Sequence, residues 1–173
     1  ELDRLPSYAE LARRLYARAC CPWVFFTDSD GQYVARDFWK LAAHIDAGHD
    51  MIRGAKTGRK DPLFRRVASA VFNKIVLFLF NVNYTDVNAA FFLIRRDALR
   101  DVRGRLDCME TLINTELLLR MELENYSIRQ VYVLHRHRRF GVSRGLRPSG
   151  LIRHAFKAVK GLYAIKAGYR TQD

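Results

Sequence analysis

Residues 24 to 32 of the chain read Val24-Phe25-Phe26-Thr27-Asp28-Ser29-Asp30-Gly31-Gln32. An apolar, β-prone run ends at two acids that stand one residue apart, and a glycine follows them. This pattern is typical of a buried strand in a parallel sheet, and ligands of such sheets gather at the carboxyl ends of the strands. Asp28 and Asp30 can both reach one pocket around the strand end. The segment therefore predicts an α/β fold with a ligand site at one edge of its sheet.

The two acids allow two interpretations. Carboxylates are the hard oxygen ligands that Mg2+ and Mn2+ prefer, and such an ion commonly shares itself with substrate phosphates. The same residues, Asp28 to Gly31, are also good material for an Asx turn that binds nothing. From these residues alone, a D-x-D pattern does not separate a metal site from a turn.

Length and charge narrow the classes of function. A chain of 173 residues is long enough for one domain with a sizeable core. It carries 30 Lys or Arg against 18 Asp or Glu, a formal charge of +12, which favours nucleotide phosphates, nucleic acid or an acidic membrane surface as partners. Cys20, Cys21 and Cys108 show no zinc spacing and predict reduced thiols in a cytoplasmic setting. No apolar run approaches the roughly 20 residues that span a bilayer.

Periodicity and turn residues divide the chain into alternating helices and strands. Strands are expected at residues 23–27, 50–53, 89–94 and 127–134. Helices are expected at 8–19, 34–47, 62–79, 111–125 and 151–167, with a helical turn at 95–99 and loops at 54–61, 81–88 and 135–150. This order predicts layers of helices around a mixed, largely parallel sheet.

The last part of the chain is strongly basic. From His135 to Arg170 there are ten Lys or Arg and no acid. Arginines of the loop 135–150 could grip phosphate, or the loop could be a solvated basic surface. RNA binding is the weaker alternative because the aromatic spacing of a stacking platform is missing, so no nucleic acid partner is expected. The helix 151–167 is amphipathic and basic, which suits either a membrane interface or ordinary packing on a core.

Four blocks of sequence, taken in order, resemble one family. The first block is 25–32, with the pattern D-x-D-G-Q, and the second is 54–62 together with Arg65-Arg66 and Asn73. The third is 85–96, which is similar to the pattern D-x-x-x-G-F-x-L-x-R-R. The fourth combines 114–120 with 131–144, and the latter segment follows the pattern V-x-V-x-H-x-x-R-x-x-G-x-S-R. Together they resemble the family-2 glycosyltransferases of the GT-A fold. Within that family they are most similar to enzymes that move a sugar from a nucleotide sugar to a polyprenyl (dolichyl-type) phosphate.

The resemblance implies a GT-A-like three-layer sandwich around a mixed, mostly parallel sheet. Residues 1–147 would form part of a catalytic domain, and 148–173 a basic amphipathic helix at the membrane interface. The family's first half, which opens with a V-x-I-P-x-Y-N-E strand end and holds the base and ribose, has no counterpart here. The chain is therefore expected to be the C-terminal portion of such a domain. Whether this portion is active without the first half is left open by the sequence.

The reaction that the resemblance implies is inverting transfer, dependent on Mg2+ or Mn2+, from a UDP- or GDP-linked sugar to a polyprenyl phosphate at the cytoplasmic face of a membrane. Two alternatives stay open. One is a family-2 transferase with a hydroxyl acceptor, which builds a polysaccharide or glycolipid. The other is an inactive relic or a basic binding module.

The resemblance also assigns roles to individual residues. The metal would be held by Asp28, Asp30, Gln32 and His135. The groups nearest the reaction would be Asp30, Arg138, Asp86 and Glu116, and phosphates would be neutralised by Lys56, Arg59, Arg66, Arg138 and Arg144. Two residues depart from the family pattern, since Lys56 stands where Arg is usual and Ala90 where Gly is usual.

Overall fold

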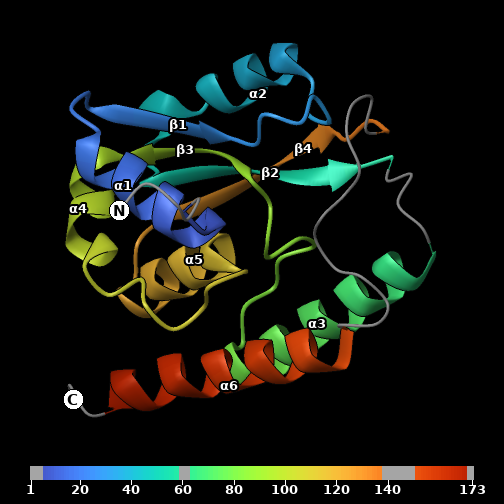
Figure 1. Cartoon of the computed structure of the whole chain (residues 1–173). Helices are drawn as coiled ribbons and strands as arrows, with labels where there is room; N and C mark the ends of the chain where they lie inside the picture. Colours follow the sequence, from blue (N-terminus) through green and yellow to red (C-terminus); the bar gives the residue numbers. More distant parts are fainter. Residues whose placement is uncertain (1–5, 59–62, 138–150, 171–173) are drawn as a thin grey trace.

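The structure is a computed structural model, and it describes residues 6–58, 63–137 and 151–170 of the chain. Helices lie on both faces of a sheet (Figure 1). The sheet contains β1 (Trp23–Thr27), β2 (Met51–Thr57), β3 (Phe91–Arg95) and β4 (Ile128–Leu134). The α-helices are α1 (Tyr8–Arg18), α2 (Phe38–Ala42), α3 (Leu63–Phe80), α4 (Arg96–Arg103), α5 (Ile113–Leu123) and α6 (Leu151–Arg170).

The sheet is mixed, as expected, with strand order β1-β3-β2-β4. β3 is antiparallel to both of its neighbours, whereas β2 and β4 are parallel. β1, β2 and β4 therefore all run in one direction, and only β3 runs against them. The carboxyl ends of three strands and the amino end of β3 consequently meet at one edge of the sheet.

Three predicted elements are wrong in their extent. The helical turn expected at 95–99 is the eight-residue helix α4. The helix expected at 34–47 is instead a 3-10 turn (Ala35–Asp37), the short α2 and a second 3-10 turn (Ile45–Ala47). Tertiary contacts override the helical periodicity here, because the buried Asp37 carboxylate accepts the main-chain N–H of Leu134 at 2.6 Å. The strand expected at 50–53 continues to Thr57, through residues that were expected to be a loop.

Close packing explains the glycine at position 54 of β2. A Cβ at this position would lie 2.7 Å from a methyl group of Val133 on β4 and 3.1 Å from the ring of Phe91 on β3. The neighbouring side chains thus close over the β2 backbone, and a larger residue would separate the strands. The loop-like composition of this segment reflects close packing and not a turn.

The core of the described residues lies in three clusters. One cluster packs α2 on the sheet through Leu41, Ile52 and Val133. A second packs α1, α4 and α5 on the opposite face, with Phe92 and Leu117 at its centre. These two confirm the expected three layers. The third cluster lies beyond α5, where α3 and α6 pack side by side beneath it (Figure 1).

Helix α6 buries one side and exposes the other. Ala158, Leu162 and Ile165 are buried against α3 and α5, whereas Phe156 is 73% exposed. α6 therefore packs on the core along one face. Among the helices in the described ranges, the structure contains none that is both long and apolar enough to cross a membrane.

Candidate active site

The predicted acidic motif lies at the edge of the sheet where β1, β2 and β4 end. Asp28 follows β1, and its main-chain N–H donates to the carbonyl oxygen of Ala90, just before β3, at 3.2 Å. The carbonyl oxygen of Thr57, at the end of β2, accepts the N–H of His135 from beyond β4 at 3.1 Å. Main-chain bonds thus link the segments that carry the predicted site residues into one rim.

Asp28 is oriented by a helix that the motif itself does not include. The hydroxyl of Tyr8, on α1, donates to Asp28 Oδ1 at 2.8 Å and accepts the side-chain N–H of Asn114 at 3.1 Å. Tyr16 donates in turn to Asn114 Oδ1 at 3.3 Å. Burial, followed by the negative charge of Asp28, raises the pKa of Tyr8, so the phenol stays protonated and keeps donating.

Asp30 closes the turn that follows β1. Its Oδ1 accepts the main-chain N–H of Gln32 at 3.1 Å, and Gly31 between them adopts a positive φ of 72°. This is the geometry of an Asx turn, so that interpretation of the motif is confirmed. A turn of this kind still presents two carboxylates at the sheet edge, so it does not exclude a metal site.

Gln32 joins the two sides of the rim. Its side-chain amide donates to the main-chain carbonyl oxygen of Arg136 at 3.2 Å, and its main-chain carbonyl oxygen accepts the main-chain N–H of Arg136 at 2.7 Å. The next residue, Tyr33, forms a β-bridge with the buried His135, and their rings meet edge to face at 5.1 Å. Asp30 and His135, predicted as metal ligands from distant parts of the sequence, thus belong to neighbouring segments.

Lys56 and Asp86 form an ion pair at the same edge. Lys56 Nζ lies 3.6 Å from Asp86 Oδ2, and both side chains are largely shielded from solvent. Tyr33 covers the pair from one side, because the lysine nitrogen lies 5.8 Å from its ring centroid. Burial, followed by the charge of Asp86, raises the pKa of Tyr33. The structure therefore brings the predicted phosphate-binding lysine and the predicted acceptor-side acid into direct contact.

Arg53 supports this pair from beneath. It lies within β2, is 1% exposed, and its guanidinium donates to the Asp86 carbonyl oxygen at 2.7 Å. Burial lowers the pKa of Arg53, and the charge of Asp86 opposes that shift. Asn73 of α3 holds the flanking backbone, donating to the Thr85 carbonyl oxygen at 2.6 Å and accepting the Val87 N–H at 3.5 Å. The loop around Asp86 is consequently held in place from β2 and α3.

Glu116 occupies a different position from the other predicted acids. It is completely buried on α5, and its two carboxylate oxygens accept the main-chain N–H groups of Asp107, Cys108 and Met109 at 2.9–3.1 Å. The guanidinium of Arg120 lies 3.6 Å away. Asp107, Cys108 and Glu116 also come close enough to one another to hold a metal ion, but the guanidinium lies against all three side chains and disfavours a cation there.

The remaining predicted site residues are Arg59, Arg66, Arg138 and Arg144. Arg66 is exposed on α3. Arg59, Arg138 and Arg144 fall outside the described residues, as does most of the basic loop.

Three residues of the rim escaped the sequence analysis. Arg53 had a signal, since a charged residue within an apolar strand suggests a buried partner. Tyr33 directly follows the acidic motif and could have been suspected. Tyr8 lies far from the motif in the chain, and nothing in the sequence connects it to Asp28.

Comparison with known proteins places this geometry in context. No family model matches the chain. A dolichyl-phosphate hexose transferase from Haloferax volcanii is 27% identical over 120 residues, which cover 68% of this chain and 51% of that protein. The chain thus spans about half the length of the curated relative that it matches.

Solved structures show the same fold. A glucosyl-3-phosphoglycerate synthase from Mycobacterium tuberculosis, crystallised with phosphoglyceric acid, superposes with a TM-score of 0.65 at 16% identity, covering 95% of this chain and 56% of that one. The same synthase with Mn2+, UDP and phosphoglyceric acid superposes equally well, over 93% and 54%. These likenesses confirm the predicted α/β fold class, and the curated relative agrees with the resemblance to glycosyltransferases.

Proposed function

We propose that this chain carries the metal-binding and acceptor-side part of a glycosyltransferase that moves a sugar from a nucleotide sugar to a polyprenyl phosphate. The similar dolichyl-phosphate hexose transferase and the fold shared with a synthase crystallised with Mn2+ and UDP support it. The observation that carries the proposal is the convergence of Asp28, Asp30, Lys56 and Asp86 at one sheet edge. In this proposal, residues 1–147 belong to the catalytic domain and 148–173 to a membrane-proximal helix.

The donor set at the edge fits a divalent cation. Asp28 and Asp30 supply carboxylate oxygens, and Tyr8 orients the first of them. A bound Mg2+ or Mn2+ would act as a Lewis acid on the departing nucleoside diphosphate. Lys56 would place a positive charge beside the phosphates. Asp86 would hold that lysine in position through the ion pair.

The state of the two candidate bases favours a phosphate acceptor. Glu116 accepts main-chain N–H groups with both oxygens, and Asp86 is paired with Lys56. A hydroxyl acceptor needs a base to take its proton, whereas a phosphate is already ionised at neutral pH and attacks directly. Its oxygen would bond to the anomeric carbon as the bond to the diphosphate breaks, with inversion. The geometry therefore supports a phosphate over an alcohol.

A transfer assay tests this function. The protein is incubated with Mn2+, a radiolabelled UDP- or GDP-sugar and dolichyl phosphate, and label in the lipid extract is measured. Label is expected with the phosphate, and EDTA is expected to remove it. Transfer to dolichol or a sugar hydroxyl without transfer to dolichyl phosphate would contradict the proposal.

A hydroxyl acceptor is the second candidate, because the structural neighbours include a synthase crystallised with phosphoglyceric acid, which carries a hydroxyl group. In that case Asp86 or Glu116 would have to act as the base. The same assay separates the two candidates through the acceptor that is labelled.

Tyr8→Phe is expected to weaken Mn2+ binding about tenfold or more, because groups that orient a metal ligand typically contribute that much to affinity. The change removes only the hydroxyl that donates to Asp28. Calorimetric titration with Mn2+ and UDP measures it. Tyr132→Phe, at an exposed tyrosine on β4, is the matched control. Equal Mn2+ affinity in the two variants would mean that Tyr8 only packs.

A further inference from the structure

We infer that helices α3 and α6 together form a surface that lies on an anionic phospholipid leaflet. This inference deepens the proposed function by naming the surface that meets the membrane, and only its biological purpose rests on that function. The surface is called the α3–α6 face below. Its exposed large apolar residues are Leu63, Phe64, Val67, Val71, Leu77 and Phe78 of α3, and Phe156 and Tyr163 of α6.

The apolar residues of α3 follow one side of the helix. Leu63, Val67, Val71 and Phe78 recur at helical spacing, and Phe78 is 87% exposed. The opposite side of α3 contributes Val76 to the core. The described residues cover the packed side of α3 but leave its apolar outer side exposed. Exposed apolar patches of this kind typically contact a partner or a membrane.

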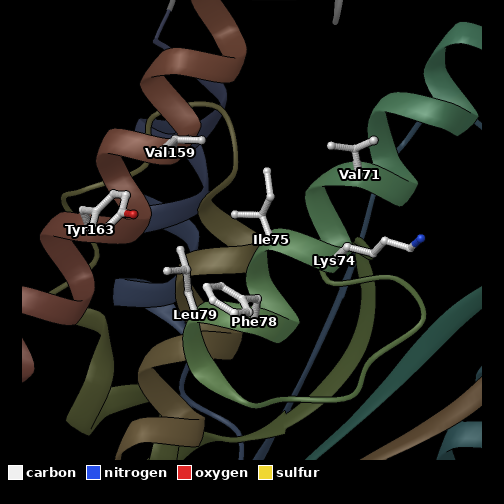
Figure 2. A pocket seen from close by; sticks show the side chains of 7 residues that line it. All are labelled: Val71, Lys74, Ile75, Phe78, Leu79, Val159 and Tyr163. Carbon is white, nitrogen blue, oxygen red and sulfur yellow. The ribbon is translucent and has the colours of Figure 1, made fainter.

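Helix α6 continues this surface. Phe156, Lys160 and Tyr163 recur at helical spacing on the side away from the buried Leu162. A groove of about 360 Å3 separates the two helices, with Val159 and Tyr163 on its α6 side and Ile75 and Phe78 on its α3 side (Figure 2). Its lining is apolar apart from Lys74 and the Tyr163 hydroxyl. The groove is thus suited to the hydrocarbon of a lipid chain.

The positive charge of α3 and α6 indicates which partner the α3–α6 face binds. Neither α3 nor α6 contains an acidic residue. Their exposed cationic residues are Arg66 and Lys74 on α3, and Arg153, Lys157 and Lys160 on α6. Lys157 also pairs with Glu110 at 3.6 Å, at the exposed edge of α6. Basic side chains around an apolar stripe bind anionic headgroups while the apolar groups enter the acyl region, and long basic side chains reach outward from such a surface. A second copy of the chain would place like charges opposite one another.

The surface and the candidate active site are connected along the chain. α3 begins shortly after β2 ends at Thr57, and its Asn73 holds the loop of Asp86. A leaflet on the α3–α6 face would therefore lie next to the elements that shape the acceptor side. The lipid end of a polyprenyl phosphate could remain in the membrane while its phosphate reaches Lys56.

Flotation with vesicles tests the inference without nucleotide, metal or polyprenyl phosphate, so its outcome is independent of catalysis. The chain is expected to float with vesicles of 70% phosphatidylcholine and 30% phosphatidylglycerol. It is expected to stay in solution with phosphatidylcholine alone, and to be released by 0.5 M NaCl because salt screens the headgroup charge. Equal binding to both vesicle types, or no flotation with either, would overturn the inference.

Two pairs of variants locate the binding surface. Phe78→Ser with Phe156→Ser is expected to reduce flotation about tenfold or more, whereas Trp39→Ser, at a 70% exposed residue on α2, leaves it unchanged. Lys157→Glu with Lys160→Glu is expected to reduce it similarly, since each basic residue contributes about a fivefold change. Arg18→Glu with Arg129→Glu, exposed on α1 and β4, is the control. Unchanged flotation in both test variants would overturn the inference. The inference would also be overturned if the chain did not float and instead formed a dimer that Phe78→Ser dissociates.

Discussion

Asp30→Ala is expected to weaken Mn2+-dependent binding of UDP or GDP more than about 100-fold. Removing a residue that merely orients a metal ligand costs up to about 100-fold in affinity, and removing a ligand itself should cost more. The fold should survive, because Asp30 is only partly buried and lies in the turn that follows β1, where its side chain accepts the main-chain N–H of Gln32. Calorimetric titration of each nucleotide with and without Mn2+ measures the effect.

Asp46→Ala is the matched control for this experiment. Asp46 is an exposed aspartate in the 3-10 turn Ile45–Ala47, away from the acidic motif. The Asp46→Ala variant should bind Mn2+ and nucleotide like the unmodified protein. If Asp30→Ala also retains Mn2+-dependent binding, the acidic motif is only an Asx turn and the metal site must be sought elsewhere.

Glu116→Ala is expected to lower the free energy of unfolding by about 3 kcal/mol, because the change leaves the Arg120 guanidinium and three main-chain N–H groups, including that of the buried Met109, without their acceptor. For a chain of this length, that corresponds to a fall in Tm of about 6–12 °C. Differential scanning calorimetry measures it. Glu110→Ala is the control, since Glu110 is an exposed glutamate whose ion pair with Lys157 contributes less than about 1 kcal/mol.

The same residue decides between a structural and a catalytic role. Glu116→Gln keeps the shape and one oxygen acceptor, so it should fold and be measurable in the transfer assay well below its Tm. If Glu116 only holds the segment 107–109, the rate should change little. If it were a general base, the rate should fall about 100-fold or more. A large fall in rate with an unchanged Tm would contradict the structural assignment.

The local patterns predicted what depends on neighbours in sequence. The positions of the strand 23–27 and of the turn at Asp28 to Gly31 are confirmed, because an apolar run that ends in Asp-Ser-Asp-Gly determines both within a few residues. The expectation of a buried strand with parallel neighbours was wrong, since β1 is half-exposed at the end of the strand order and pairs with the antiparallel β3. The start of α1 is determined just as locally, since the Ser7 hydroxyl accepts the main-chain N–H of Glu10. The α-helices with long periodic patterns were likewise placed to within a few residues at most ends.

The errors arise where distant segments decide the outcome. The strand β2 was cut short because Gly54 and Lys56 look like loop residues until β3 and β4 are packed beside them. The helix at 34–47 is broken because Asp37 bonds to the end of β4. The roles of Tyr8 and Glu116 depend on contacts between α1, α5 and remote loops, which no short pattern reveals.

The position of β3 has a consequence for how the molecule folds. β3 is paired on both sides, and its partner β1 is far away in the chain, with Thr27 opposite Phe91. Forming this ladder requires closure of a long loop, which makes such pairings slow compared with local ones. The same ladder brings Asp28 to Ala90, so the acidic rim assembles only when this non-local pairing is complete. We therefore expect a chain that has folded its helices but not yet inserted β3 to lack the rim altogether.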